Sequence, residues 1–194
     1  MTDEVKPYPL MTDAIRCGKV DELEGLFQRF PNFIGLEVPG FGDWLIYACH
    51  HGNVSILEFL VDAGFDVNKL NSAGDQAPLE SAASAGKVDN VDFLLRHGAT
   101  VRTDSARLNP LFGAILGKSL EAAAKVVDAG IDTSKRYTLG AQTNPPLDAV
   151  AFAMLHGQRE IAHLIALKNA SGDEAIAQAA MAEGLQIAEQ ATSK

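Results

Sequence analysis

The chain lacks most of the features that mark exported, membrane-spanning or nucleic-acid-binding proteins. Its first nine residues carry Asp3 and Glu4 where a secretory signal has basic residues and an apolar core. No apolar stretch approaches the length that crosses a bilayer. With 16 Lys and Arg against 25 Asp and Glu, the net charge of −9 disfavours the phosphate neutralisation that nucleic acids require. We therefore expect a cytoplasmic protein that binds neither nucleic acid nor a membrane.

Cysteine is also scarce, since only Cys17 and Cys49 are present among the 194 residues. Both fall on predicted first helices of successive repeats, at similar places. Two small thiols, buried or half-buried, are the favoured interpretation in preference to a disulfide. A reducing compartment agrees with this interpretation.

Motifs of catalysis and cofactor binding are missing as well. Gly40-Phe41-Gly42 lacks the third glycine and the preceding strand of a dinucleotide-binding turn. No Gly-x-Ser-x-Gly elbow and no Walker phosphate loop occurs. His50 and His51 are adjacent and so point in different directions on a helix, and His156 and His163 lie on either side of a turn glycine. Neither pair has the i, i+4 spacing of helical metal ligands. We expect a protein that is not an enzyme and holds no metal ion or cofactor.

What the sequence does contain is a repeat of about 34 residues. The frame is clearest as Leu45…Gly52…Gly64, which recurs with the same spacing as Leu79…Gly86…Gly98. Between these residues run two apolar patterns of helical period, separated by a glycine turn. Two helices of this size cannot bury their apolar faces alone, so successive units must stack on one another.

Weaker copies extend the frame on both sides. Met11, Leu111 and Leu147 lead further units, and the last of them reaches its turn glycine only at Gly157, which predicts a longer first helix. Ser171-Gly172-Asp173-Glu174 has the pattern of a capping box and opens a final helix, whose Gly184 predicts a frayed end. This helix either covers the last repeat or serves as a partner-binding tail. We expect a single domain over 1–194, with repeats at about 10–35, 41–70, 75–104, 107–136 and 143–169 and a cap helix over 172–190.

Over about residues 10–169 the repeat resembles the ankyrin repeat family. The resemblance is carried by Ala77-Pro78-Leu79-Glu80 with Ala82-Ala83, and by Gly64-Phe65-Asp66-Val67-Asn68. The histidine that usually follows the leucine is absent in every unit, so we expect other contacts to hold the turns between repeats. The resemblance implies an all-α solenoid of about five helix–turn–helix repeats with hairpin-like loops and a C-terminal cap helix, which binds another protein along its concave side.

In ankyrin-like units, the positions just before each turn glycine project onto that concave side. Aromatic residues near the histidine pair are typical of interface anchors. Trp44 stands at the usual proline position, and its alternative role is to fill the groove between two repeats. Loop residues add candidates, each of which is otherwise a solvated surface group. The predicted partner-binding residues are Phe41, Trp44, Tyr47, His50, His51, Asp75, Gln76, Arg102, Asp104, Arg107, Arg136, Tyr137 and His156.

Two further features bear on the partner. The loop from Gly35 to Phe41 is apolar, so it either packs against the protein or is used in binding. Residues 1–66 carry a net charge of −7 and residues 101–136 one of +2. An acidic surface suits a basic partner, and it equally suits a soluble end of the solenoid.

The sequence therefore predicts a non-enzymatic protein–protein interaction module that is monomeric when free. One candidate partner is a basic toxin or effector, for which the chain would be the bacterial immunity protein. The alternative is a regulatory adaptor or scaffold without a toxin partner.

Overall fold

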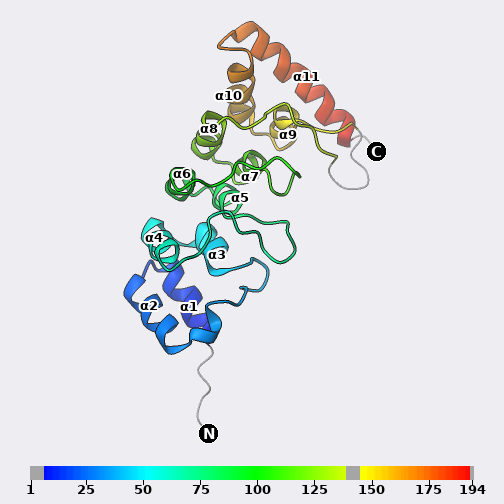
Figure 1. The fold of residues 1–194 in the computed structure, drawn as a ribbon. Helices are drawn as coiled ribbons and strands as arrows, with labels where there is room; N and C mark the ends of the chain where they lie inside the picture. Colours follow the sequence, from blue (N-terminus) through cyan, green and yellow to red (C-terminus); the bar gives the residue numbers. More distant parts are fainter. Residues whose placement is uncertain (1–6, 139–144, 193–194) are drawn as a thin grey trace. The chain divides into compact units, whose positions relative to one another are not determined.

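The computed structural model describes residues 7–138 and 145–192. The chain divides into two compact units, the first ending at residue 100 and the second beginning at residue 101. The described residues form eleven α-helices, one 3-10 helix and two isolated β-bridges (Figure 1). This confirms the predicted all-α class of paired helices. None of the described helices combines the length and apolar character that a bilayer crossing requires. Residues 143 and 144, the expected start of the fifth repeat, lie outside the described part.

The first unit contains three helix pairs. Their first helices α1, α3 and α5 follow one another in space, and so do their second helices α2, α4 and α6. The sides that face each other are apolar, and Leu45, Leu57 and Leu94 are completely buried. The elements are α1 (Pro7–Arg16), α2 (Val20–Arg29), a 3-10 helix (Pro31–Phe33), α3 (Trp44–His51), α4 (Val54–Asp62), α5 (Pro78–Ser84) and α6 (Val88–Arg96).

Side chains at the helix starts explain where these helices begin. One carboxylate oxygen of the buried Asp43 accepts hydrogen bonds from the backbone N–H groups of Leu45 and Ile46, both at 3.1 Å. Pro78 is the first residue of α5, where a missing N–H costs no hydrogen bond. Trp44 occupies the corresponding place in α3, as the sequence predicts.

The second unit contains two helix pairs and a final helix. They are α7 (Pro110–Leu116), α8 (Leu120–Asp128), α9 (Ala149–Leu155), α10 (Arg159–Asn169) and α11 (Glu174–Thr192). The long helix α11 packs against both α9 and α10. Its first turn is capped by Asp173, whose carboxylate accepts from the N–H groups of Ala175 at 2.9 Å and Ile176 at 3.1 Å. The capping box expected from Ser171 is therefore wrong, because Ser171 lies in a left-handed turn with φ 51°.

Gly184 has a packing role that the sequence does not indicate. It is buried, and a Cβ at this position would lie 3.0 Å from Cγ1 of Val150 and 3.3 Å from the backbone nitrogen of Ala151. The absence of a side chain thus lets α11 approach α9 closely. The expected fraying after Gly184 is wrong, because α11 continues to Thr192 and Ala188 is only 3% exposed.

The fifth repeat also differs from its expected register. Helix α9 has seven residues, as α5 and α7 do, so the predicted longer first helix is wrong. Leu147 precedes the helix and forms an antiparallel bridge with Tyr137. Asp148 caps α9, and Val150 takes the place that Leu79 has in α5. The additional residues therefore belong to the loop before α9.

The turn after α7 keeps its backbone conformation without its glycine. Gly86 and Gly157 adopt left-handed conformations with φ 66° and 70° in the corresponding turns. In the α7–α8 turn, Gly117 is right-handed with φ −70°, and Lys118 is the left-handed residue with φ 54°. A side chain in this conformation costs about 1–2 kcal/mol.

Asparagine side chains hold the turns of the first unit, in place of the missing histidines. The Asn68 amide donates to the Gly98 carbonyl at 3.0 Å, and its oxygen accepts from the Thr100 N–H at 2.7 Å. Asn71 accepts from the N–H groups of Asp75 at 3.0 Å and Gln76 at 3.1 Å. This confirms the expectation that other contacts hold the turns.

One of the two cysteines differs from its expected environment. Cys49 is buried within α3, whereas Cys17 is exposed just after the end of α1. The prediction of a buried or half-buried Cys17 is wrong, because the helix ends one residue before it.

Candidate protein-binding surface

Four of the predicted residues gather on one surface of the first unit. We call Phe41, Tyr47, His50 and His51 the aromatic patch. The ring centroid of Phe41 lies 5.1 Å from Tyr47, 5.5 Å from His50 and 5.1 Å from His51. The His51 ring lies 4.5 Å from Tyr47 and 4.6 Å from His50. The two imidazoles were expected to point in different directions, but both turn toward Phe41.

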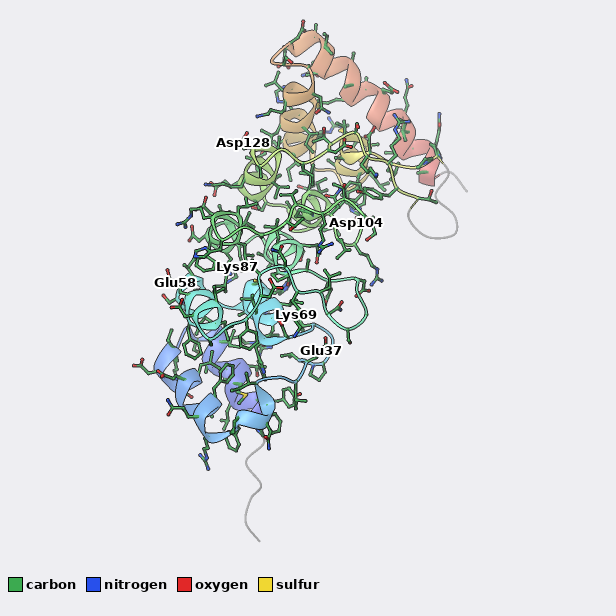
Figure 2. The ribbon with its side chains drawn as sticks, in the orientation of Figure 1. Glu37, Glu58, Lys69, Lys87, Asp104 and Asp128 are labelled. Carbon is green, nitrogen blue, oxygen red and sulfur yellow. The ribbon has the colours of Figure 1, made fainter. Side chains whose placement is uncertain are left out.

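The loop before α3 positions Phe41. Val38 is buried and pairs with Gly42, which closes the loop on itself. Glu37 is labelled in Figure 2. Its carboxylate accepts hydrogen bonds from the backbone N–H and the hydroxyl of Ser72, both at 2.6 Å. Of the two alternatives for this apolar loop, the structure therefore shows that it packs against the protein, and it holds Phe41 beside the rings of α3.

Burial and nearby cations shape the electrostatics of the aromatic patch. Tyr47 is only 2% exposed, and burial raises the pKa of its hydroxyl. The pKa of His51 is lowered, mainly by burial and further by the neighbouring His50, Arg16 and Lys87. The guanidinium carbon of Arg16 lies 5.8 Å from the Tyr47 ring centroid. Phe41, His50 and His51 stay half-exposed, so the aromatic patch presents both ring surface and nitrogen atoms to solvent.

Trp44 does not belong to this surface. Its side chain is completely buried, and its indole N–H donates to the Phe33 carbonyl at 2.8 Å. Its ring packs near Tyr8 at 5.5 Å and Phe27 at 6.2 Å. The prediction that Trp44 contacts a partner is corrected, because the residue fills the space between the first two helix pairs.

The predicted loop residues of the first unit stabilise their own loop. Asp75 and Gln76 are half-buried, and the Asn71 amide donates to their side-chain oxygens at 3.0 and 3.4 Å. The same amide donates to the Phe41 carbonyl at 3.3 Å. The loop after α4 is thereby tied to the loop that carries Phe41.

The predicted loop residues of the second unit are largely engaged with neighbours. The Tyr137 hydroxyl donates to the Thr103 carbonyl at 2.9 Å and accepts from the Asn109 amide at 3.2 Å. Arg102 forms an ion pair with Asp104 at 3.6 Å, and Arg136 forms one with Asp148 at 3.5 Å. Arg107 is exposed on the same unit.

His156 is the remaining predicted residue, and it belongs to the second unit. Its exposed ring lies edge-on to Phe152 at 4.5 Å, and partial burial lowers its pKa. Phe152 in turn stacks on Phe112 at 4.2 Å. Among the described residues, no group of three or more His, Cys, Asp or Glu side chains lies close enough to hold a metal ion.

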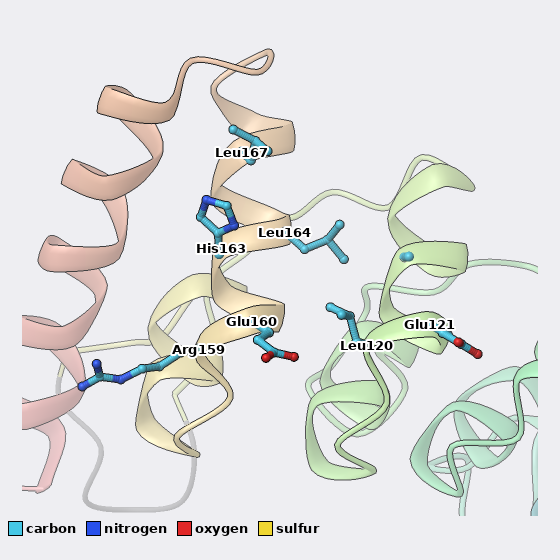
Figure 3. A pocket seen from close by; sticks show the side chains of 8 residues that line it. Leu120, Glu121, Arg159, Glu160, His163, Leu164 and Leu167 are labelled. Atoms are coloured by element: carbon cyan, nitrogen blue, oxygen red, sulfur yellow. The ribbon is translucent and has the colours of Figure 1, made fainter.

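Sequence reasoning missed an apolar groove in the second unit, between α8 and α10. It encloses about 670 Å³ and is lined mainly by Leu120, Ala124, Leu164 and Leu167 (Figure 3). Leu120 and Leu164 point toward each other across it, and Glu160 lies at one end. The sequence carries no signal for this groove, because the 40% exposure of Leu120, the first residue of α8, is visible only in the structure.

The comparison with known proteins agrees with this architecture. Residues 45–137 match the family model for ankyrin repeats in three copies. No curated protein matches the chain. Over residues 45–137 the protein therefore belongs to the ankyrin repeat family, whose members serve as protein–protein interaction modules.

Proposed function

We propose that the protein binds a partner protein through the aromatic patch and acts by that binding, without catalysis. The observation that carries the proposal is a half-exposed group of three rings: Phe41 in the loop before α3, and His50 and His51 at the end of α3, a helix whose other large side chains are buried. Aromatic residues such as Phe are enriched in protein–protein interfaces relative to the rest of the surface.

The setting of the aromatic patch supports this role. Helix α3 packs between α1 and α5, and hydrogen bonds from Ser72 and Asn71 hold the loop that carries Phe41. A partner that binds here does not have to order this loop first. Pre-organisation of this kind removes part of the entropic cost of association.

The proposal is tested by affinity purification from the native source with matched baits. We expect Phe41→Ala to lower the affinity for the captured partner about 10-fold or more, as truncation of an interface anchor does. Leu36→Ala is the control, because Leu36 is 44% exposed in the same loop and lies outside the aromatic patch. The affinity of each variant for the identified partner is measured by calorimetry. Equal affinity of Phe41→Ala and wild type would contradict the proposal.

A narrower form of the proposal is immunity against a toxin. The charge of residues 1–100 supports a partner with a basic surface, because this segment has seven Lys and Arg against fifteen Asp and Glu. Co-expression with the product of a neighbouring gene that is toxic on its own should restore growth. Persistent toxicity would favour the alternative, a regulatory adaptor without a toxin partner.

A further inference from the structure

Two cationic side chains, Arg16 and Lys87, gather with two imidazoles at one end of the aromatic patch although their unit is strongly acidic. Residues 1–100 carry a net charge of −8, from seven basic and fifteen acidic side chains. Even so, Arg16, His50, His51 and Lys87 lie around the same turn ends of α1, α3 and α5. In the described residues, none of the four forms an ion pair with a carboxylate.

These groups face the His51 imidazole from three elements. Arg16 ends α1, and its guanidinium lies over the Tyr47 ring that the His51 ring contacts. His50 contributes from α3 itself, with its ring 4.6 Å from His51. Lys87 stands in the turn after α5, and its charge contributes to the lowered pKa of His51. Of the acidic groups on these helices, Asp13 of α1 lies three residues before Arg16 and its charge acts on Tyr47, whereas Asp43 is engaged with the N–H groups of α3.

The neighbouring positions on α5 leave this end open. Ser84 and Ala85 correspond in the repeat to His50 and His51, and both are small and half-exposed. The cationic groups are therefore bordered by rings on one side and by small side chains on the other. A group that enters here meets positive charge next to apolar ring surface, where charge-assisted hydrogen bonds are stronger than in bulk water.

We propose that the group formed by Arg16, His50, His51 and Lys87 binds a Glu or Asp carboxylate on the surface of the partner protein. Arg16 supplies the planar fork that matches a carboxylate, and Lys87 supplies a mobile point charge. The surrounding acidic surface repels further acidic groups, so the partner presents one carboxylate within a neutral or basic surface. This arrangement fixes the register of the complex as well as its affinity. The inference depends on the function proposed above and names the chemistry of the partner at that site.

The test uses the full chain and two synthetic peptides, acetyl-Gly-Phe-Glu-Gly-amide and its Gln counterpart. Binding is followed through the imidazole Cε1–Hε1 signals of His50 and His51 by NMR. We expect the Glu peptide to shift both signals saturably in the millimolar range, and the Gln peptide to leave them nearly unchanged. Equal shifts with both peptides, or no saturable shift, would overturn the inference.

Matched charge variants sharpen this result. Arg16→Gln and Lys87→Gln should each weaken the binding of the Glu peptide several-fold. Lys19→Gln and Arg96→Gln are controls with the same charge change, because these residues already pair with Glu22 and Asp92. Equal weakening by all four variants would overturn the inference, since only the net charge would then matter. Displacement of the Glu peptide by an equal concentration of inorganic phosphate would also overturn it, by showing a general anion site.

The two proposals can fail separately. If Phe41→Ala weakens binding of the natural partner and Arg16→Gln does not, the function proposed for the aromatic patch stands and the carboxylate inference fails. If Phe41→Ala leaves the natural partner unaffected, the function fails whatever the peptides show.

Discussion

At the scale of the residue, Lys118 performs a backbone task that glycine performs elsewhere in the chain. Its φ of 54° lies in the left-handed region, where a side chain crowds the following carbonyl. We expect Lys118→Gly to raise the free energy of unfolding by about 0.5–1 kcal/mol, because the relief of strain exceeds the added freedom of the unfolded chain. Urea unfolding followed by circular dichroism measures the change.

The matched control is Gly157→Ala, at the corresponding position with φ 70°. It introduces the strain that Lys118→Gly removes, so it should lower the unfolding free energy by about 1 kcal/mol. A loss of stability in Lys118→Gly would show that the lysine side chain contributes a contact worth more than the strain.

His51 predicts a dependence of stability on pH. Its pKa is lowered from the ordinary value of 6.5 by burial and by His50, Arg16 and Lys87, so the folded protein binds its proton more weakly than the unfolded chain. The contribution of neutral His51 to the free energy of unfolding is therefore complete above about pH 6.5, and it is lost as the pH falls through the lower pKa of the folded protein. We expect His51→Gln to lose less stability than wild type between about pH 7.5 and 5.5.

Urea titrations at both pH values measure this difference for the wild type and the variant. His97→Gln is the comparison, as His97 lies on the same unit outside the aromatic patch. An unchanged pH slope in His51→Gln would contradict the prediction.

The sequence predicts the members of the aromatic patch better than their roles. His50 and His51 directly precede the turn glycine Gly52, a position that is visible in the repeat, and Phe41 and Tyr47 are visible as aromatic residues near this pair. Trp44 is visible at the proline position, but its burial depends on Tyr8 and Phe27 from the previous helix pair. Lys87 follows a turn glycine as an ordinary surface lysine would, and only the fold brings it to His51.

At the scale of the element, packing and helix propensity favour different residues at Gly184, where α11 contacts α9. Replacing Gly184 by leucine favours the helix by up to about 1 kcal/mol through propensity alone. The added side chain, however, would start 3.0 Å from Val150 Cγ1, and such overpacking costs about 1–3 kcal/mol. We therefore expect Gly184→Leu to lower the midpoint of thermal unfolding of the second unit.

Ala182→Leu is the control for this prediction, because Ala182 is exposed on the same helix. It should leave the midpoint nearly unchanged. A higher midpoint in Gly184→Leu would indicate that α11 moves away from α9 without loss.

The register of the elements is predictable where the repeat frame is regular. Leu45 and Leu79 locate α3 and α5, but Leu147 does not locate α9. Leu147 and Val150 are three residues apart and so fit the same helical face, which makes the two registers equivalent by periodicity. The Tyr137–Leu147 bridge decides between them, and it joins residues on both sides of a long loop. Asp148 as a helix cap was the local signal for the correct register.

At the scale of the whole molecule, the contacts of a repeat protein connect neighbouring elements. Helix α11 packs against α9 and α10, and the single tryptophan, Trp44, lies in the first unit. Stability in such proteins is close to a sum of local and nearest-neighbour contributions. We expect Gly184→Leu to lower the urea midpoint seen by circular dichroism more than the midpoint seen by Trp44 fluorescence.

The two signals are recorded on the same samples, and coincident shifts of both midpoints would contradict the prediction. Coincidence would mean that the two units unfold as one cooperative body. The repeat frame continues across the division at residue 100, where Leu79 and Leu111 are 32 residues apart and Leu45 and Leu79 are 34 apart. The single domain expected from the sequence therefore stays a prediction.

The unequal exposure of the two thiols has a practical consequence. Cys17 is exposed and directly follows Arg16, whereas Cys49 is completely buried and its pKa is raised well above the ordinary value. A maleimide dye should therefore attach to one sulfur only, since the thiolate is the reactive form and must be reachable. The unaltered chain thus offers a ready position for a fluorescent reporter, one residue away from the charge that we expect the partner to seek.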